Sequence, residues 1–286
     1  MNTYLVTTEH LENSLWFRDT EDFKVGMNAV AVVHASMKTV RILAFILMSN
    51  HVHFVLECQE KEAKAFIDAL KKHYSRYLRN KYGLHEQLRR NGVDVRLLDG
   101  PESVEKAIAY VHMNSVAANI CLNSTQYPWG TAQCIFSQIK PNGTPANSLK
   151  RRESFKRLHS KVSLPPSYLY GNDGYIIPES YVEVKRVENI FRTPKRMHYF
   201  LCSSSKSKIR METNEAVPAF RDQLILSGIG DLCSSLFLKS TLSELNDKEL
   251  TELMRQLNYR FACSIHQLAR ITGYSYEKVV QQLDSE

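Results

Sequence analysis

The sequence predicts an α+β fold: a ferredoxin-like antiparallel sheet with helices on one face, followed by a mostly helical C-terminal region. Residues 43–57, LAFILMSNHVHFVLE, contain two apolar runs joined by the turn-prone pair Ser49-Asn50, which is typical of two paired strands. Around this hairpin the expected order is strand, helix, strand, strand, helix, strand, helix. That order is the ferredoxin-like arrangement with one added helix.

Periodicity and capping signals place the elements around the hairpin. Thr20-Glu21-Asp22 resembles a helix start, with a capping residue followed by acidic residues, and Pro101 marks another start. Alternation between two turn signals indicates a strand at 93–98. The expected elements are a strand at 4–8, a helix over 20–37, the hairpin, a helix over 60–82, the strand at 93–98 and a helix over 101–119.

The second strand of the hairpin carries two histidines. Side chains alternate between the two faces of a strand, so one set can be buried while the other brings two imidazoles to the same face. The first set is Val52, Phe54 and Leu56, and the second is His51, His53, Val55 and Glu57. The two rings are expected close enough to share one ion. Two buried histidines satisfied by backbone carbonyls are the alternative, and for an isolated His-x-His we favour it.

Composition bounds the class of protein. The chain has 286 residues, 43% of them hydrophobic, which is enough for a proper core in one large or two smaller domains. A net charge of +7 suggests a polyanionic partner, nucleic acid first. Six scattered cysteines without a C-x-x-C pair fit reduced thiols. With no leader and no membrane-length apolar stretch, we expect a soluble, cytoplasmic protein.

Basic residues gather on the helix expected over 60–82 and in the segment that follows the first 135 residues. The residues we expect to contact phosphates are Lys71, Lys72, Arg76 and Arg79 on the helix, and Arg151 and Arg152 in the later basic segment. A solvated helix face is the usual alternative for the first group. The segment over 137–167 reads as a basic connector, which could follow a DNA strand or only keep the chain soluble.

The last third of the chain is predicted to be helical. Helices are expected over 178–191 and 193–201, and then over 247–262, 264–272 and 275–283, with Gly273 as a turn; the polar segment 203–214 has no assigned role. The final three resemble a helix-turn-helix module, in which Tyr276 and Lys278 would be exposed toward DNA. A generic three-helix bundle is an equal alternative.

The helix over 101–119 carries the sequence AYVHMNSVAAN. Tyr110 and Asn114 are four residues apart, so they project from one helical face, whereas His112 points elsewhere. Opposite a sheet that bears two histidines, this pair could bring a nucleophile and a third ligand to one ion. A tyrosine of the hydrophobic core is the alternative for Tyr110.

Several stretches together resemble the single-tyrosine HUH transposases, and most closely the REP-associated tyrosine transposase branch. The matching pieces are LAFILMSNHVHFVLE, YVHMNSVAAN and the segment Tyr127-Pro128-Trp129-Gly130, with a looser match over residues 7–23. The resemblance covers residues 1–135. This chain departs from the family at Ser115, where the family commonly has proline.

The resemblance implies roles for individual residues. It makes His51 and His53 metal ligands, Tyr110 the nucleophile and Asn114 the third ligand of Mg²⁺ or Mn²⁺, and it leaves Tyr127-Pro128-Trp129 as a packing element. It further implies a catalytic domain at 1–135. Composition and helical patterning of the remaining chain predict a basic connector and helical extension at 136–240, and a DNA-binding module resembling a helix-turn-helix at 241–286.

The implied activity is a metal-dependent DNA transposase or nickase that cleaves and rejoins single-stranded or hairpin DNA through a covalent 5′-phosphotyrosine. A phenol with a pKa near ~10 is a poor nucleophile at neutral pH, so a cation that polarises the phosphodiester would help. Two alternatives stay open: an inactive, domesticated transposase that regulates as a DNA-binding protein, and a metal hydrolase that does not use Tyr110. The sequence does not decide whether the chain acts alone or as a homodimer.

Overall fold

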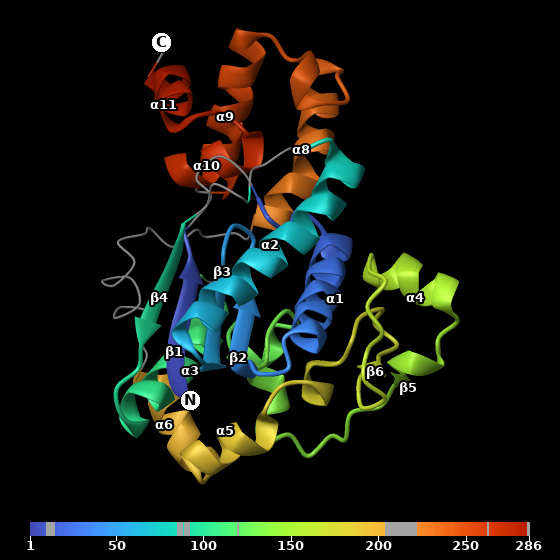
Figure 1. The fold of residues 1–286 in the computed structure, drawn as a ribbon. Helices are drawn as coiled ribbons and strands as arrows, with labels where there is room; N and C mark the ends of the chain where they lie inside the picture. The colour runs from blue at the N-terminus through green and yellow to red at the C-terminus, as the bar shows by residue number, and fades with distance from the viewer. Residues whose placement is uncertain are drawn as a thin grey trace.

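A four-stranded antiparallel sheet lies at the centre of the N-terminal half in the computed structural model (Figure 1). The structure describes residues 1–9, 15–84, 88, 92–118, 120–203, 222–261 and 263–284. The strands are β1 (Asn2–Thr8), β2 (Arg41–Leu47), β3 (Val52–Cys58) and β4 (Val93–Leu97). Their spatial order is β2-β3-β1-β4, which confirms the predicted ferredoxin-like arrangement and places the histidine-bearing strand inside the sheet.

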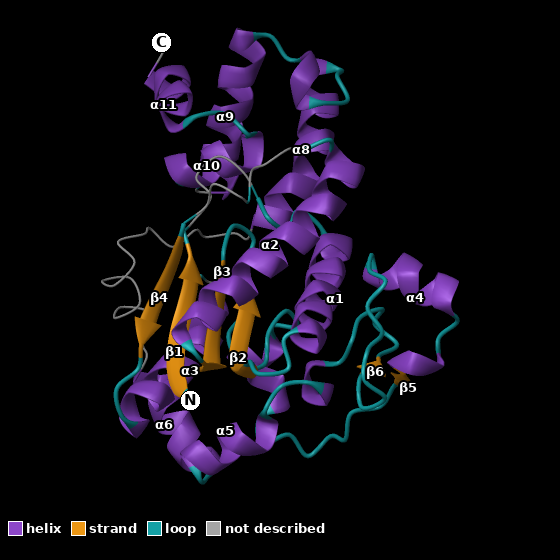
Figure 2. Cartoon of the chain, in the orientation of Figure 1, coloured by secondary structure: helices purple, strands orange, loops and turns teal. Residues whose placement is uncertain are grey.

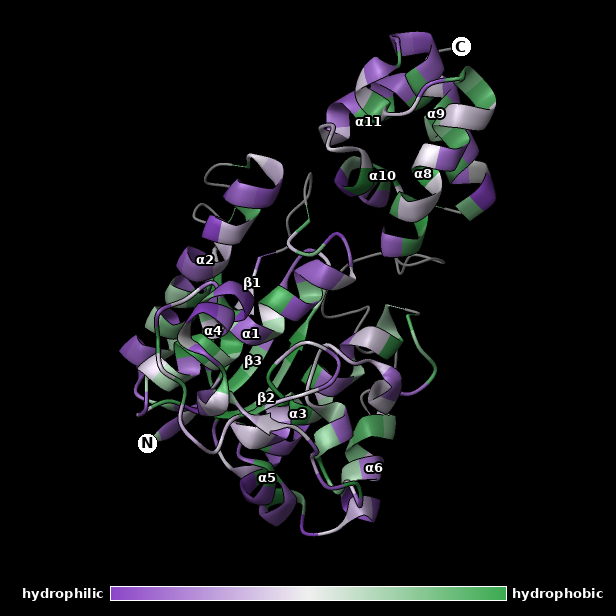
Figure 3. Ribbon diagram, turned by 90° about the vertical axis from the view of Figure 1, so that its right-hand side faces the viewer, coloured by the Kyte–Doolittle hydropathy of each residue, from purple (hydrophilic) through white to green (hydrophobic). Residues whose placement is uncertain are grey.

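Helices cover both faces of the sheet, as Figure 3 shows from the side. On one face α1 (Thr20–Ser36) and α2 (Glu60–Tyr82) pack on Phe54 and Leu56, which the alternation predicted to be buried. On the other face α3 (Pro101–Ala117) packs on Ile46 and Val55, with α5 (Val184–Phe191) and α6 (Pro194–Ser203) beside it. The sequence predicted helices on one face only. That prediction is correct for α1 and α2 but wrong for α3, α5 and α6, which cover the other face. Both faces of β2 and β3 are apolar, so each needs a cover.

The register of β3 confirms the predicted alternation of its side chains. Val52, Phe54 and Leu56 belong to the core under α1 and α2, while Val55 belongs to the core under α3. His53 alternates with Val52 and Phe54 and shares the face of Val55, so it is on the face of α3, where it pairs with Thr7 of β1. The hairpin turn is closed by the amide of Met48, which donates to the carbonyl of His51 at 2.9 Å.

A buried carboxylate ties α1 to α2. Asp19, one residue before the predicted start, caps α1 by accepting from the amide of Asp22 at 2.8 Å. The side chain of Asp22 is fully buried and accepts from Tyr77 Oη and Lys81 Nζ, both at 2.7 Å. Burial lowers the pKa of Lys81, but its hydrogen bonds to Asp19 and Asp22 outweigh this and raise the pKa.

The segment after α3 is mostly loop and wraps one side of the first domain (Figure 2). It contains α4 (Arg151–Leu158) and the small pair β5 (Thr144–Pro145) and β6 (Leu169–Tyr170). The predicted helix over 178–191 is present only as α5, because Pro178–Ser180 forms a 3₁₀ turn. The other short 3₁₀ turns are Ser124–Gln126, Ala132–Cys134, Ala146–Ser148 and Leu242–Glu244.

The C-terminal helices share a core of their own. They are α8 (Asp222–Phe237), α9 (Asp247–Phe261), α10 (Ile265–Thr272) and α11 (Tyr276–Asp284). The last three confirm the predicted helices, and Gly273 ends α10 with a φ of 77°. We did not predict α8. Most of the segment 203–214, to which we assigned no role, lies outside the described residues, and the domain boundaries stay predictions.

None of the helices in the described ranges combines the length and the apolar composition needed to cross a membrane.

Candidate metal and tyrosine site

Two imidazole rings meet at the beginning of β3. His51 precedes the strand and His53 lies within it, and both are almost fully buried. Their ring centroids are 4.7 Å apart with an angle of 85° between the ring planes. The hairpin therefore brings the two histidines together, as the strand alternation predicted, at a separation that lets both rings approach a single cation.

Helix α3 brings a tyrosine to the same place. The ring of Tyr110 is half-buried, and its centroid lies 5.3 Å from that of His53 with an interplanar angle of 80°. One turn further along α3, the side-chain nitrogen of Asn114 donates to the carbonyl of Tyr110 at 2.9 Å. That bond leaves the amide oxygen of Asn114 as its candidate ligand atom. The pairing of Tyr110 with the histidines is thus a feature of the tertiary structure.

Each imidazole is held through its Nδ1 atom. Nδ1 of His51 lies 2.8 Å from Oδ1 of Asn50, and Nδ1 of His53 lies 3.0 Å from Oγ1 of Thr7. An amide oxygen only accepts, so Nδ1 of His51 carries the proton, and in the neutral form of the ring the lone pair is on Nε2. The same tautomer of His53 would donate to Thr7. Partners of this kind orient metal-binding histidines in proteins.

Our sequence interpretation missed Thr7 and Asn50 as parts of this site. The sequence indicated Asn50 only as a turn residue. Its position next to His51 could have suggested that its side chain holds the imidazole. Thr7 faces His53 because β1 pairs with β3 in one particular register, and the sequence does not contain that register.

The donor set fits a divalent cation with open coordination positions. Two ring nitrogens and one amide oxygen are neutral ligands, and such mixed nitrogen and oxygen sets accept Mg²⁺ or Mn²⁺ together with a phosphate oxygen. In the described part of the chain, no group of three or more His, Cys, Asp or Glu side chains is placed to hold a metal ion. The roles of His51, His53 and Asn114 as ligands therefore stay predictions.

Other residues of the motifs have structural roles. His112 points away from the histidine pair, as predicted: its Nε2 lies 3.0 Å from Thr131 Oγ1, and burial lowers its pKa to about 4. Tyr127 donates to the carbonyl of Leu47 at 2.7 Å, and Trp129 stacks on Phe23 with centroids 5.0 Å apart. These contacts confirm that Tyr127-Pro128-Trp129 is a packing element.

The predicted DNA contacts on α2 are divided by the fold. Lys72, Arg76 and Arg79 are exposed, so they remain candidates for phosphate contacts. Lys71 is only 3% exposed, so its expected place on the solvent face is wrong. Burial lowers its pKa, and the charges of Asp68 and Glu9 partly offset this. The helical period places Lys71 at the edge of the buried face, next to Leu70.

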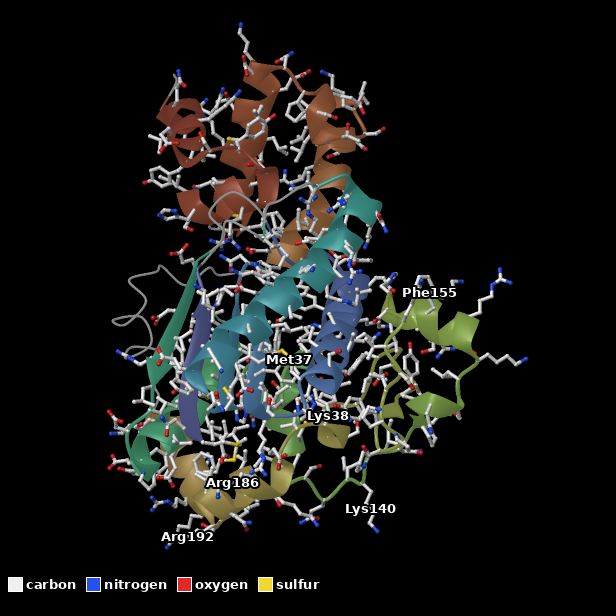
Figure 4. All side chains as sticks on the ribbon, viewed as in Figure 1. Met37, Lys38, Lys140, Phe155, Arg186 and Arg192 are labelled. Atoms are coloured by element: carbon white, nitrogen blue, oxygen red, sulfur yellow. The ribbon has the colours of Figure 1, made fainter. Side chains whose placement is uncertain are left out.

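The basic segment around α4 contains one exposed predicted contact. Arg152 is exposed, whereas the side chain of Arg151 lies outside the described part of the structure. Phe155, labelled on α4 in Figure 4, is 50% exposed. Arg152 and Phe155 line an open cavity of about 720 Å³ between α4 and the segments on either side of it. A cation and an exposed aromatic ring suit the backbone and bases of a nucleic acid strand.

The two predicted contacts on α11 are engaged within the C-terminal helices. Tyr276 is partly buried and packs on His266 with ring centroids 4.7 Å apart. Nζ of Lys278 lies 3.5 Å from Asp247 Oδ1 and 4.9 Å from the centroid of the Tyr274 ring. DNA contacts by either residue stay predictions, because the helices by themselves are compatible with a plain bundle.

Comparison with protein families relates part of the N-terminal half to known proteins. Residues 16–93 match the family described as "Transposase IS200 like". This match confirms the resemblance to transposases that the hairpin motif indicated. It includes β2, β3 and both histidines, and it ends before α3, so it does not extend to Tyr110 or Asn114.

Comparison with solved structures and curated proteins adds two findings. The chain is similar to a solved structure described as "Structure of the REP associates tyrosine transposase bound to a REP hairpin", with 15% sequence identity and a TM-score of 0.38. The similarity covers 49% of this chain and 82% of the other. The comparison with curated proteins found no match.

Proposed function

We propose that this chain is a metal-dependent DNA transposase and nickase that cleaves and rejoins single-stranded or hairpin DNA through a covalent 5′-phosphotyrosine. One observation carries the proposal: the ring of Tyr110 packs against His53, and His53 packs against His51. A nucleophile and a pair of imidazoles therefore come from two different elements to one place. The family match over residues 16–93 supports the transposase class.

The residues have distinct roles in the proposed reaction. His51, His53 and Asn114 would hold Mg²⁺ or Mn²⁺, which polarises the phosphodiester and offsets the charge that builds on its oxygens. Thr7 and Asn50 would orient the two imidazoles through Nδ1, so that the Nε2 atoms can serve as ligands. Packing against His53 holds the Tyr110 ring next to the candidate ligands, so the phenol oxygen and the bound phosphate can meet.

The proposed step exchanges one phosphodiester for another. The Tyr110 oxygen attacks phosphorus and gives its proton to solvent. A bond from that oxygen to phosphorus forms, the bond from phosphorus to the 3′ oxygen breaks, and the 3′ oxygen takes up a proton from solvent. The products are a 5′-phosphotyrosine and a free 3′-hydroxyl. A different 3′-hydroxyl can then attack the phosphotyrosine and release the tyrosine, so rejoining needs no ATP. No side chain of the described site is assigned as general base.

The alternative is a DNA-binding regulator that keeps the fold without the reaction. The separate core of α8–α11 supports it, because such a unit could bind DNA by itself. Incubation of the full chain with labelled hairpin DNA and Mn²⁺, followed by a denaturing gel, separates the two functions. The enzyme forms an adduct on the 5′ fragment, and mass spectrometry locates it at Tyr110. Binding of the hairpins without any adduct supports the regulator and contradicts the proposal.

A further inference from the structure

A buried carboxylate joins the C-terminal helices to the loop in front of β3. Asp222 is the first residue of α8 and is 3% exposed. Ser49 Oγ of the hairpin loop donates to Asp222 Oδ2 at 2.9 Å. From α10, Gln267 Nε2 donates to Oδ1 at 2.8 Å, and Arg270 Nε lies 3.4 Å from Oδ2. One side chain thus connects three segments that are far apart in the sequence.

The loop residue Ser49 is also held from its other side. Its carbonyl accepts from the amides of Trp16 at 2.8 Å and Phe17 at 3.1 Å. Gln223 follows Asp222 in the chain, and its Nε2 donates to the carbonyl of Phe17 at 3.0 Å. Residues of the first domain and of α8 therefore enclose Ser49, and its position depends on both.

From Ser49 the contacts continue directly to the candidate site. The next residue is Asn50, whose Oδ1 accepts from Nδ1 of His51, and the turn is closed by the bond between the amide of Met48 and the carbonyl of His51. The direction of the His51 ring follows the place of Asn50, and the place of Asn50 follows the loop. A shift of Ser49 would therefore turn the ring relative to His53.

We propose that Asp222 is a positioning residue that, through Ser49, holds Asn50 and His51 in the geometry for metal binding. It thereby couples α8 and α10 to the site. This inference rests on the proposed function, since it assigns His51 to a cation. A buried carboxylate with three partners suits this task, because turning to water would break its hydrogen bonds to Ser49 and Gln267 and its contact with Arg270.

The inference is tested by titrating the full chain with Mn²⁺ in the absence of DNA. Binding is measured as the loss of the electron paramagnetic resonance signal of the free ion. Asp222→Asn keeps the shape of the side chain but removes its charge. Ser49→Ala removes only the hydrogen bond from the hairpin loop to Asp222. Both act on His51 only through Asn50, so they are expected to raise the Kd for Mn²⁺ by up to about tenfold, the lower end of the loss caused by removing a direct partner of a ligand. Glu249→Gln, which disturbs an ion pair with Lys239 inside the C-terminal helices, is the control and should leave the Kd unchanged.

Hydrogen exchange of the same variants supplies a readout that does not need metal. Faster exchange of the amides of Trp16, Phe17 and Met48 is expected in Asp222→Asn and Ser49→Ala, but not in Glu249→Gln. Wild-type Mn²⁺ affinity in both test variants overturns the inference even if their stability falls. If the wild-type chain binds no Mn²⁺, the proposed function fails. Hydrogen exchange then decides separately whether Asp222 positions the loop. Unchanged exchange in both variants overturns that positioning role, and faster exchange supports it.

Discussion

The ring of Tyr110 meets the ring of His53 at an angle of 80°, with 5.3 Å between the centroids. One residue comes from α3 and the other from β3, and the contact exists only because α3 packs on that face of the sheet. The contact places a phenol beside a candidate metal ligand. The Tyr110 side chain is partly buried and packs against the core under α3.

Tyr110→Phe should abolish the covalent adduct with hairpin DNA and leave binding of DNA and Mn²⁺ within about twofold of the wild type. The ring contact with His53 is kept, while the attacking oxygen is lost. Adducts are counted on a denaturing gel and binding by titration. Cleavage that survives in Tyr110→Phe would instead assign the site to a metal hydrolase that does not use the tyrosine.

Thr7→Val should weaken Mn²⁺ binding about 10- to 100-fold, because it removes the hydroxyl that holds Nδ1 of His53 while keeping a strand-forming shape. Thr3→Val is the matched control. Thr3 is on the same face of β1 but pairs with Glu57, so the Thr3→Val variant should bind Mn²⁺ with the Kd of the wild type. The assignment of His53 as a ligand fails if both variants bind Mn²⁺ equally well.

Lys72→Gln combined with Arg79→Gln should weaken DNA binding and reduce its salt dependence. Both side chains are exposed on α2, and each phosphate contact contributes about 0.9 to the slope of log K against log salt on duplex DNA. The double variant should therefore lower the slope by about 2. Lys38→Gln with Arg192→Gln, two exposed residues labelled in Figure 4, is the control of equal charge. Equal slopes for both pairs would exclude α2 as the DNA face.

His73 should make the protein less stable in mild acid. Nε2 of His73 donates to the carbonyl of Leu158 at 3.1 Å, and Nδ1 lies 3.3 Å from the guanidinium of Arg76, so the ring is neutral. Burial, together with the charge of Arg76, lowers its pKa to about 4. At pH values between about 6.5, the pKa of His73 in the unfolded state, and about 4, its pKa in the folded state, the unfolded state binds more protons than the folded state. The free energy of unfolding therefore falls as the pH falls through this range.

Urea unfolding at pH 7.5 and pH 5.0 measures the effect. The wild type should lose about 2 kcal/mol through His73 between these two values, and His73→Gln should lose that much less. His198→Gln, at an exposed position on α6, should lose the same as the wild type. Equal losses in all three proteins would show that His73 is not the group that titrates.

Residues close together in the sequence predicted most of the elements. The alternation of Val52, Phe54 and Leu56 with the histidines is a property of one strand, and the helical spacing of Tyr110 and Asn114 is a property of one helix. Both are local, so they could be predicted. The strand order followed from the order of elements, since few topologies connect them without crossings.

The sequence by itself determined that two imidazoles share a strand face, that a tyrosine and an amide share a helix face, and that the C-terminus is helical. Only the tertiary structure decided that α3 covers the histidine face, that Thr7 holds His53, that Lys71 is buried, and that Asp222 reaches Ser49. The reason is physical: each of these contacts joins segments whose meeting depends on strand register and on the packing of whole faces.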